Sequence, residues 1–142
     1  MAKARILCVD DDRPTLTLVS MILKKEGYEV NVALDGYEGL SLARGLRPDL
    51  ILLDIMMPGM DGYEVCRRLK ADPDTAKIEV IMLTAKGNVD GNTLDDDLAA
   101  RGVREQWQGF EAGATEWLTK PVKARDLVQR VKTVLWAAGF AP

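Results

Sequence analysis

The 142-residue sequence predicts an α/β fold in which a five-stranded parallel sheet lies between two layers of helices. Three observations lead to this prediction. Short apolar segments alternate five times with amphipathic stretches of helical period, the connections are short, and three of the apolar segments are apolar at almost every position. Strands of that last kind are covered on both faces, as in a parallel sheet between helices. Such alternation also predicts right-handed crossovers.

The elements follow from this pattern in chain order. The expected strands are 5–9, 29–33, 50–53, 80–83 and 115–118, of which the first, third and fourth (RILCV, LILL and VIML) are the almost wholly apolar ones. The expected helices are 14–26, 36–44, 62–71, 92–111 and 123–138.

Several residues mark helix ends. Asp12 is placed to cap the first helix, Pro14 suits its first turn, and Gly27 is a stop signal after it. Asp61 and Gly62 are expected to begin the third helix through capping, with no chemical role of their own.

The last helix carries one apolar stripe, formed by Leu127, Val131, Val134 and Ala138. At about 100° per residue, Trp136 falls on the opposite, outward side. Such a tryptophan either packs locally, on Phe140 one turn further, or anchors a partner or a dimer.

Composition excludes several classes of protein. The 19 basic and 22 acidic residues give a net charge of −3, which argues against coating nucleic acid or an anionic membrane. The chain has no histidine, which excludes histidine triads, imidazole zinc sites and a phosphohistidine of its own.

Cys8 and Cys66 form no CxxC pair and fit buried thiols in a reducing compartment. With neither a signal peptide nor an apolar run of about 20 residues, the expected location is the cytoplasm.

We expect residues 1–142 to form a single domain, because the length suits one core and no linker or repeat interrupts it. The 30 residues between Thr84 and Thr115 exceed what a helix of about 12 residues and two loops need. The excess is expected near 86–98, between the fourth strand and the fourth helix. Two interpretations stay open, an elaboration that bears on output and a tolerated surface insertion. The acidic run 95–97 within it fits a solvated helix start better than a second cation site.

Chemically active side chains collect where the strands end. Asp10 and Asp11 follow the first strand, Asp54 the third, Thr84 the fourth and Lys120 the fifth. In an open parallel sheet these ends lie at one edge, where ligands bind. Crowded carboxylates need a cation between them, and Mg²⁺ prefers oxygen ligands and bridges to phosphoryl groups. The pattern therefore predicts a divalent-cation and phosphoryl site. The alternatives are a capped helix start at the acidic run, a solvated lysine and a threonine that only ends its strand.

The motifs that carry these residues are VDDDRP, LLDIMMPGMDGYEV, MLTA and LTKP. Together and in this order, over nearly the whole chain, the sequence resembles the receiver domain of two-component response regulators. The resemblance implies a flavodoxin-like (βα)5 sandwich with strand order 2-1-3-4-5. It also implies a cis peptide bond between Lys120 and Pro121.

The resemblance assigns roles to individual residues. Asp54 would be the phosphoacceptor, Asp11 a direct Mg²⁺ ligand, and Asp10 a ligand acting mainly through water. The backbone carbonyl of Met56 would complete the protein ligands. Thr84 and Lys120 would contact the phosphoryl group, and Trp117 would be either the aromatic switch residue or plain core. The positions of Met56 and Lys86 are ones that influence phosphoryl hydrolysis in this family.

The implied function is a signalling domain rather than an enzyme with its own turnover. It would take a phosphoryl group from a sensor histidine kinase or a histidine phosphotransfer protein in an Mg²⁺-dependent step. The switched surface, also available for a homodimer, would be that of the fourth helix, fifth strand and fifth helix. The target would be a protein, and we expect no direct contact of this chain with nucleic acid or membrane. The chain would be either a stand-alone shuttle or a piece of a longer regulator.

Two rival functions remain. An Mg²⁺-dependent phosphohydrolase with an aspartyl nucleophile would use Asp10 with Asp12, but its DxDx[TV] pattern fails at Pro14. A phosphorylation-independent interaction module would have no use for the set of acids, hydroxyl and lysine.

Overall fold

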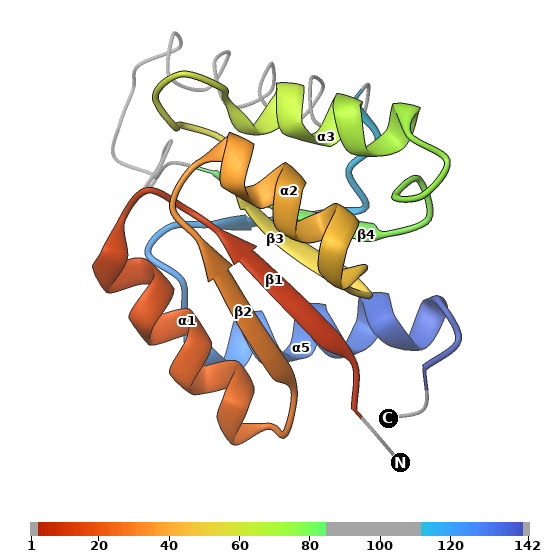
Figure 1. Ribbon diagram of the computed structural model, residues 1–142. Helices are drawn as coiled ribbons and strands as arrows, with labels where there is room; N and C mark the ends of the chain where they lie inside the picture. Colours follow the sequence, from red (N-terminus) through yellow and green to blue (C-terminus); the bar gives the residue numbers. More distant parts are fainter. Residues whose placement is uncertain (1–2, 85–111, 141–142) are drawn as a thin grey trace, which may run out of the picture.

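The computed structural model describes residues 3–84 and 112–140 (Figure 1). The expected helix 92–111 and the enlarged segment 86–98, with Lys86 and the acidic run 95–97, lie outside these residues. The described elements, in chain order, are β1 (Arg5–Val9), α1 (Arg13–Lys25), β2 (Glu29–Ala33), α2 (Gly36–Leu46), β3 (Leu50–Asp54), α3 (Gly62–Ala71), β4 (Glu79–Thr84), β5 (Glu116–Thr119) and α5 (Ala124–Ala137).

The strands form one parallel sheet in the order β2-β1-β3-β4-β5, as predicted. The register aligns the carboxyl ends of neighbouring strands. Val9 lies opposite Leu53, Asp54 opposite Leu83, and Thr84 opposite Thr119. Residues that end or follow the central strands therefore meet at one edge of the sheet.

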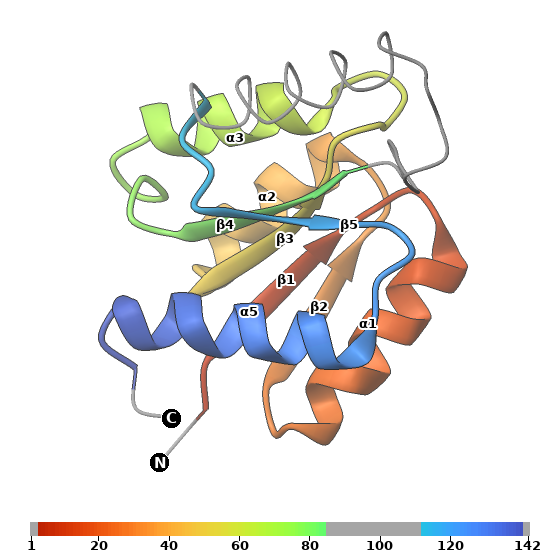
Figure 2. The same cartoon turned by 180° about the vertical axis from the view of Figure 1, so that it is seen from behind.

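Two helical layers cover the sheet (Figures 1 and 2). Helices α1 and α5 pack on one face, against a buried cluster that includes Ile6, Leu52 and Leu127. Helices α2 and α3 pack on the other, against a cluster that includes Leu7 and Leu53. Every residue of β3 is buried, because its side chains alternate between the two clusters. The prediction of strands covered on both faces is confirmed.

Aspartates start three of the helices. The carboxylates of Asp12, Asp35 and Asp61 accept hydrogen bonds from the backbone N–H groups three residues ahead, which cap α1, α2 and α3. Glu26 ends α1, and Gly27 follows with φ +94°, a conformation that favours glycine. The predicted ends of the first helix are thus confirmed to within one residue.

Several bounds expected from the sequence are wrong. Helix α2 continues to Leu46 instead of ending at residue 44, and β5 is Glu116–Thr119 instead of 115–118. The third strand extends by one residue to include Asp54, and the fourth extends at both ends to include Glu79 and Thr84, since the ladder continues beyond their apolar runs. In α5, Leu135 takes the place expected for Ala138 in the buried stripe, because the helix ends at Ala137 and the following residue is exposed. The outward position of Trp136 is confirmed by its exposure of 68%.

None of the helices within 3–84 and 112–140 combines the length and apolar character that crossing a bilayer requires.

Candidate functional site

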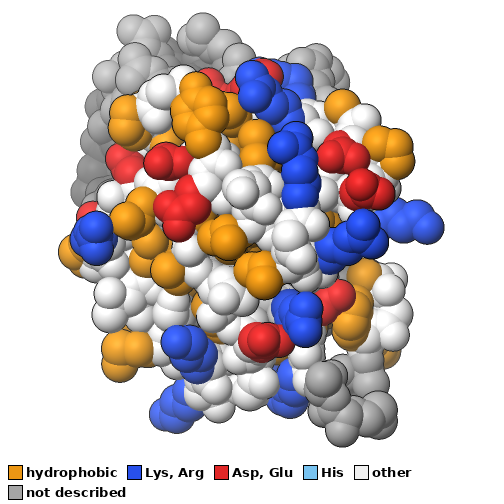
Figure 3. Space-filling model, in the orientation of Figure 1, with side chains coloured by type: hydrophobic (Ala, Val, Ile, Leu, Met, Phe, Trp, Pro, Cys, Tyr) orange, Lys and Arg blue, Asp and Glu red, His pale blue; other side chains and the backbone are white. Residues whose placement is uncertain are grey.

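An acidic group lies at the carboxyl edge of the sheet, where β1 and β3 end. Asp10 follows β1 and Asp54 is the last residue of β3, so the pairing of these two strands brings both side chains together. Asp11 extends the group toward solvent. Oxygen atoms of these three carboxylates all lie within 4.8 Å of one another. Further acidic side chains gather on the surface at the upper left of the face drawn in Figure 3, the side toward which β1 and β2 run.

Burial differs sharply within this group. Asp10 is 1% exposed and Asp54 is 3% exposed, whereas Asp11 is open to solvent. Two carboxylates held out of water at short range repel each other unless a cation lies beside them. The site thus has two buried acidic side chains and one that solvent reaches.

Lys120 supplies a positive charge to the buried pair. Its Nζ lies 2.8 Å from Asp10 Oδ2 and 3.3 Å from Asp54 Oδ1. The backbone positions the lysine, because its N–H donates to the carbonyl of Thr84 at 2.9 Å directly beyond the strands. The peptide bond between Lys120 and Pro121 is cis, as predicted.

The electrostatics follow from this arrangement. Burial, with the neighbouring charge of Asp10 in addition, raises the pKa of Asp54 to about 7, against the opposing effect of Lys120. For Lys120, burial acts to lower the pKa, but hydrogen bonding to Asp10 and the charge of Asp54 outweigh it and raise the pKa. Lys120 is therefore a protonated partner of the carboxyl groups of Asp10 and Asp54.

The donor set fits a hard divalent cation. All three donors are carboxylates, and Mg²⁺ selects oxygen ligands and retains several waters. The exposed Asp11 leaves one side of the group open to solvent, where such waters fit. Asp10, Asp11 and Asp54 are the residues that could hold the ion.

Asp12, the next residue along the chain, is engaged differently. Asp12 accepts hydrogen bonds from both the backbone N–H and the hydroxyl of Thr15, which holds its carboxylate at the start of α1. Among the described residues, the clustered acids do not include Asp12. This arrangement leaves the phosphohydrolase interpretation, which needs Asp10 with Asp12, without its second acid.

The predicted contact residues at the edge have distinct surroundings. Thr84 is buried, and its hydroxyl donates to the carbonyl of Leu118 in β5 at 3.3 Å. Trp117 is half-buried and packs against the cluster under α2 and α3. The side chain of Met56 is 65% exposed, in the loop after β3. The structure thus brings Lys120 into contact with the acids, and the hydroxyl of Thr84 contacts β5.

Sequence reasoning missed the steric importance of Gly62. A Cβ at this position would lie 2.4 Å from the carbonyl oxygen of Asp54 and 2.8 Å from the Cα of Ile55. The N–H of Gly62 also donates to the carbonyl of Ile55 at 2.9 Å. The start of α3 therefore rests directly on the backbone of Asp54, a contact that no local sequence pattern indicates.

Comparison with known proteins agrees with this geometry. The family model described as the response regulator receiver domain matches residues 6–132. The chain is 43% identical over 131 residues to the "DNA-binding dual master transcriptional regulator RpaA" of Synechocystis sp., and 45% identical over 131 residues to the "Response regulator PleD" of Caulobacter vibrioides. Each match covers 92% of this chain, but 48% and 26%, respectively, of those relatives.

A solved structure gives the same result. The response regulator receiver domain protein (CheY-like) from Methanospirillum hungatei superposes with a TM-score of 0.79 at 31% identity, over 95% of both chains. Since the family model covers most of the chain and the fold agrees, the chain belongs to the family of response regulator receiver domains.

Proposed function

We propose that this chain is a phosphorylation-switched signalling domain in which Asp54 accepts a phosphoryl group from the phosphohistidine of a partner. The observation that carries the proposal is the pairing of one lysine with two buried carboxylates at the end of the central strands. An ammonium in that position can neutralise phosphoryl oxygens as charge develops on them.

The chemical step would be a displacement at phosphorus. A carboxylate oxygen of Asp54 forms the new O–P bond, the N–P bond of the partner's phosphohistidine breaks, and the leaving imidazole takes up a proton. Asp54 is the last residue of β3 and the start of α3 packs against its backbone, so the main chain that carries the carboxylate is held in place. Positioning and charge neutralisation supply most of the rate enhancement in such transfers.

The acidic group would hold Mg²⁺ through Asp10, Asp11 and Asp54, with the backbone carbonyl of Met56 as a further ligand. When bound, the ion would supply positive charge that offsets repulsion between the nucleophile and the incoming phosphoryl oxygens. Asp11, the exposed member, would be the ligand that a substitution can remove with least disturbance of the core.

The output would be a population shift between two arrangements of the edge beside β5. The hydroxyl of Thr84 would leave the carbonyl of Leu118 to bond the phosphoryl group, and Trp117 would repack beside it. A sensor histidine kinase or a phosphotransfer protein would be the donor. A protein that reads the surface around β5 and α5 would be the target.

Intact-mass spectrometry tests the acceptor. Acetyl phosphate with Mg²⁺ should add the mass of one phosphoryl group to the wild-type protein, and chelation of Mg²⁺ should suppress the gain. Asp54→Asn should abolish it, and Asp11→Asn should slow it and raise the Mg²⁺ concentration required. Asp12→Asn is the matched control, because its carboxylate caps α1 and should leave labelling unchanged. Labelling retained in Asp54→Asn would overturn the assignment.

A further inference from the structure

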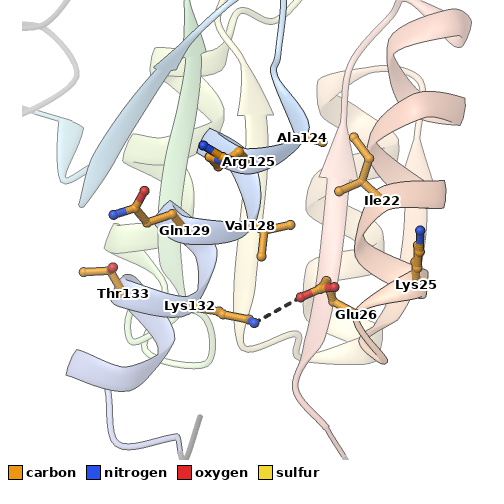
Figure 4. A pocket seen from close by; sticks show the side chains of 9 residues that line it. All are labelled: Ile22, Lys25, Glu26, Ala124, Arg125, Val128, Gln129, Lys132 and Thr133. Atoms are coloured by element: carbon orange, nitrogen blue, oxygen red, sulfur yellow. Dashed lines mark ion pairs between the residues drawn. The ribbon is translucent and has the colours of Figure 1, made fainter.

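A groove runs between helices α1 and α5, away from the acidic site. Its volume is about 670 Å³, and its lining residues are Ile22, Lys25, Glu26, Ala124, Arg125, Val128, Gln129, Lys132 and Thr133 (Figure 4). None of these residues belongs to the phosphoacceptor site. The groove therefore offers a surface whose occupation the proposed phosphotransfer does not require.

The groove combines an apolar strip with a basic rim. Ile22 and Val128 point into the space between the two helices in Figure 4, beside the methyl group of Ala124. Lys132 crosses to Glu26 at 3.0 Å, which neutralises the one acid of the lining. Within the described part of the chain, Lys25 and Arg125 are exposed and have no acidic partner. A ligand in the groove would meet apolar side chains flanked by two unneutralised cations.

The charge of the two helices extends this pattern. Together α1 and α5 carry six basic side chains and one acidic side chain, whereas the whole chain has 19 basic and 22 acidic residues. Two of the six are paired with acids outside the two helices, Arg130 with Glu116 and Lys132 with Glu26. The layer still carries a net positive charge within an acidic protein. Such a local excess attracts an acidic partner and repels a second copy of the same surface.

Trp136 continues the same face of α5. Arg125, Gln129, Lys132 and Trp136 follow one another at spacings of three or four residues, so their side chains lie along one side of the helix. At 68% exposure, the indole of Trp136 is a large apolar surface left in water. Tryptophan and arginine at the ends of a groove are typical anchors of a protein interface.

We infer that the groove between α1 and α5 is a docking site for an acidic amphipathic helix of a partner protein. Apolar side chains at i, i+3, i+4 and i+7 of that helix fill the strip beside Ile22 and Val128. Its glutamates or aspartates face Lys25 and Arg125, and its end covers Trp136. A groove between two helices accepts one ridge of side chains, a shape that a flat anionic membrane does not provide.

A designed peptide tests this inference. The probe is a synthetic helix of about 18 residues with leucines in one stripe and glutamates elsewhere, and the control peptide has lysines in place of the glutamates. In amide-shift NMR titrations, the acidic peptide should bind with a Kd below about 1 mM and move the signals of Ile22, Val128 and Trp136. The basic peptide should not bind, and binding should weaken as salt rises.

Matched variants separate the groove from net charge. Lys25→Glu with Arg125→Glu should weaken binding of the acidic peptide at least about tenfold. Arg67→Glu with Lys77→Glu makes the same change of charge at exposed positions elsewhere and should leave binding intact. Trp136→Ala should weaken binding about tenfold. All variants should keep the wild-type acetyl phosphate labelling, so this test is independent of the proposed function.

Several outcomes would overturn the docking site. One is equal binding of both peptides, and another is equal weakening by the two double variants. A third is binding of anionic lipid vesicles, but not of the acidic peptide, at the same residues. Self-association in sedimentation experiments that Lys25→Glu with Arg125→Glu abolishes would assign the groove to a second copy instead.

Discussion

The ammonium of Lys120 lies closer to Asp10, at 2.8 Å, than to Asp54, at 3.3 Å. The lysine therefore ties the end of β1 to the residue after β5 and leaves the carboxylate of Asp54 as the less tightly paired of the two. This arrangement would favour Asp54 in its proposed role as the nucleophile, since a strongly paired carboxylate is a weaker one.

Lys120→Gln should destabilise the metal-free protein, because it leaves the buried carboxyl groups of Asp10 and Asp54 without a cation. We expect the free energy of unfolding at pH 7 in the presence of a chelator to fall by about 2 kcal/mol, as measured by urea denaturation. Lys123→Gln, an exposed lysine three residues further, should change it by less than about 0.5 kcal/mol. Equal stability of the two variants would show that the ion pairs of Lys120 do not contribute to the free energy of unfolding.

Asp54 should make the metal-free protein less stable as pH rises. Its pKa is about 7 in the folded state against 3.8 for the ordinary side chain, so between these values the folded state binds a proton that the unfolded state has released. Stability contributed by this group is full below about pH 4 and declines toward pH 7, with a slope of at most about 1.4 kcal/mol per pH unit.

Urea denaturation with a chelator at about pH 4.5 to 7.5 measures this effect, because Asp54 titrates in the folded protein within that pH window. Asp54→Asn lacks the titrating group, so its curve should decline less steeply and should lie above that of the wild type at pH 7. Parallel curves would mean that the pKa of Asp54 is close to that of the unfolded chain.

Gly62→Ala should displace either α3 or the backbone of Asp54, because the added Cβ has no space. We expect a loss of about 2 kcal/mol in the free energy of unfolding and a slower acetyl phosphate reaction. Gly45→Ala is the matched control, since nothing lies within 4 Å of a Cβ there and alanine is favoured over glycine in a helix such as α2. That variant should gain about 0.5 kcal/mol. Similar losses in both variants would contradict the steric explanation.

The two cysteines should be inert in the folded protein. Burial raises the pKa of Cys8 to about 12, with the charge of Asp10 in addition, and burial raises that of Cys66 to about 11. Because only the thiolate reacts, alkylation with iodoacetamide at about pH 8 should leave the native protein unmodified and label both residues in urea. Labelling of either cysteine in the native protein would show that its burial is incomplete or transient.

The helices and strands could be predicted largely because their signals are local. Apolar runs and aspartate caps such as Asp12 and Asp61 act within a few residues, and the cis bond at Lys120 came from the family resemblance. The juxtaposition of the acids followed from strand ends in a parallel sheet. The exchange of Ala138 for Leu135 in the buried stripe could not be foreseen, because it depends on where the helix leaves the core.

Contacts between separate helices and strands could not be predicted from the sequence. The preference of Lys120 for Asp10 over Asp54 depends on differences of half an ångström or less in side-chain placement. The approach of Gly62 to the backbone of Asp54, and the groove between α1 and α5, arise only when separate segments pack together.

The hydroxyl of Thr84 already has a hydrogen-bond partner within the protein, the carbonyl of Leu118. A hydroxyl has a single proton, so Thr84 can serve β5 or a phosphoryl oxygen but not both at once. One such bond contributes about 1 kcal/mol, and a charge-assisted bond contributes more. Thr84 would therefore have two alternative hydrogen-bonding partners that differ little in free energy, so that one phosphoryl group could reverse the preference. Its bond to Leu118 in the unphosphorylated protein requires no other molecule.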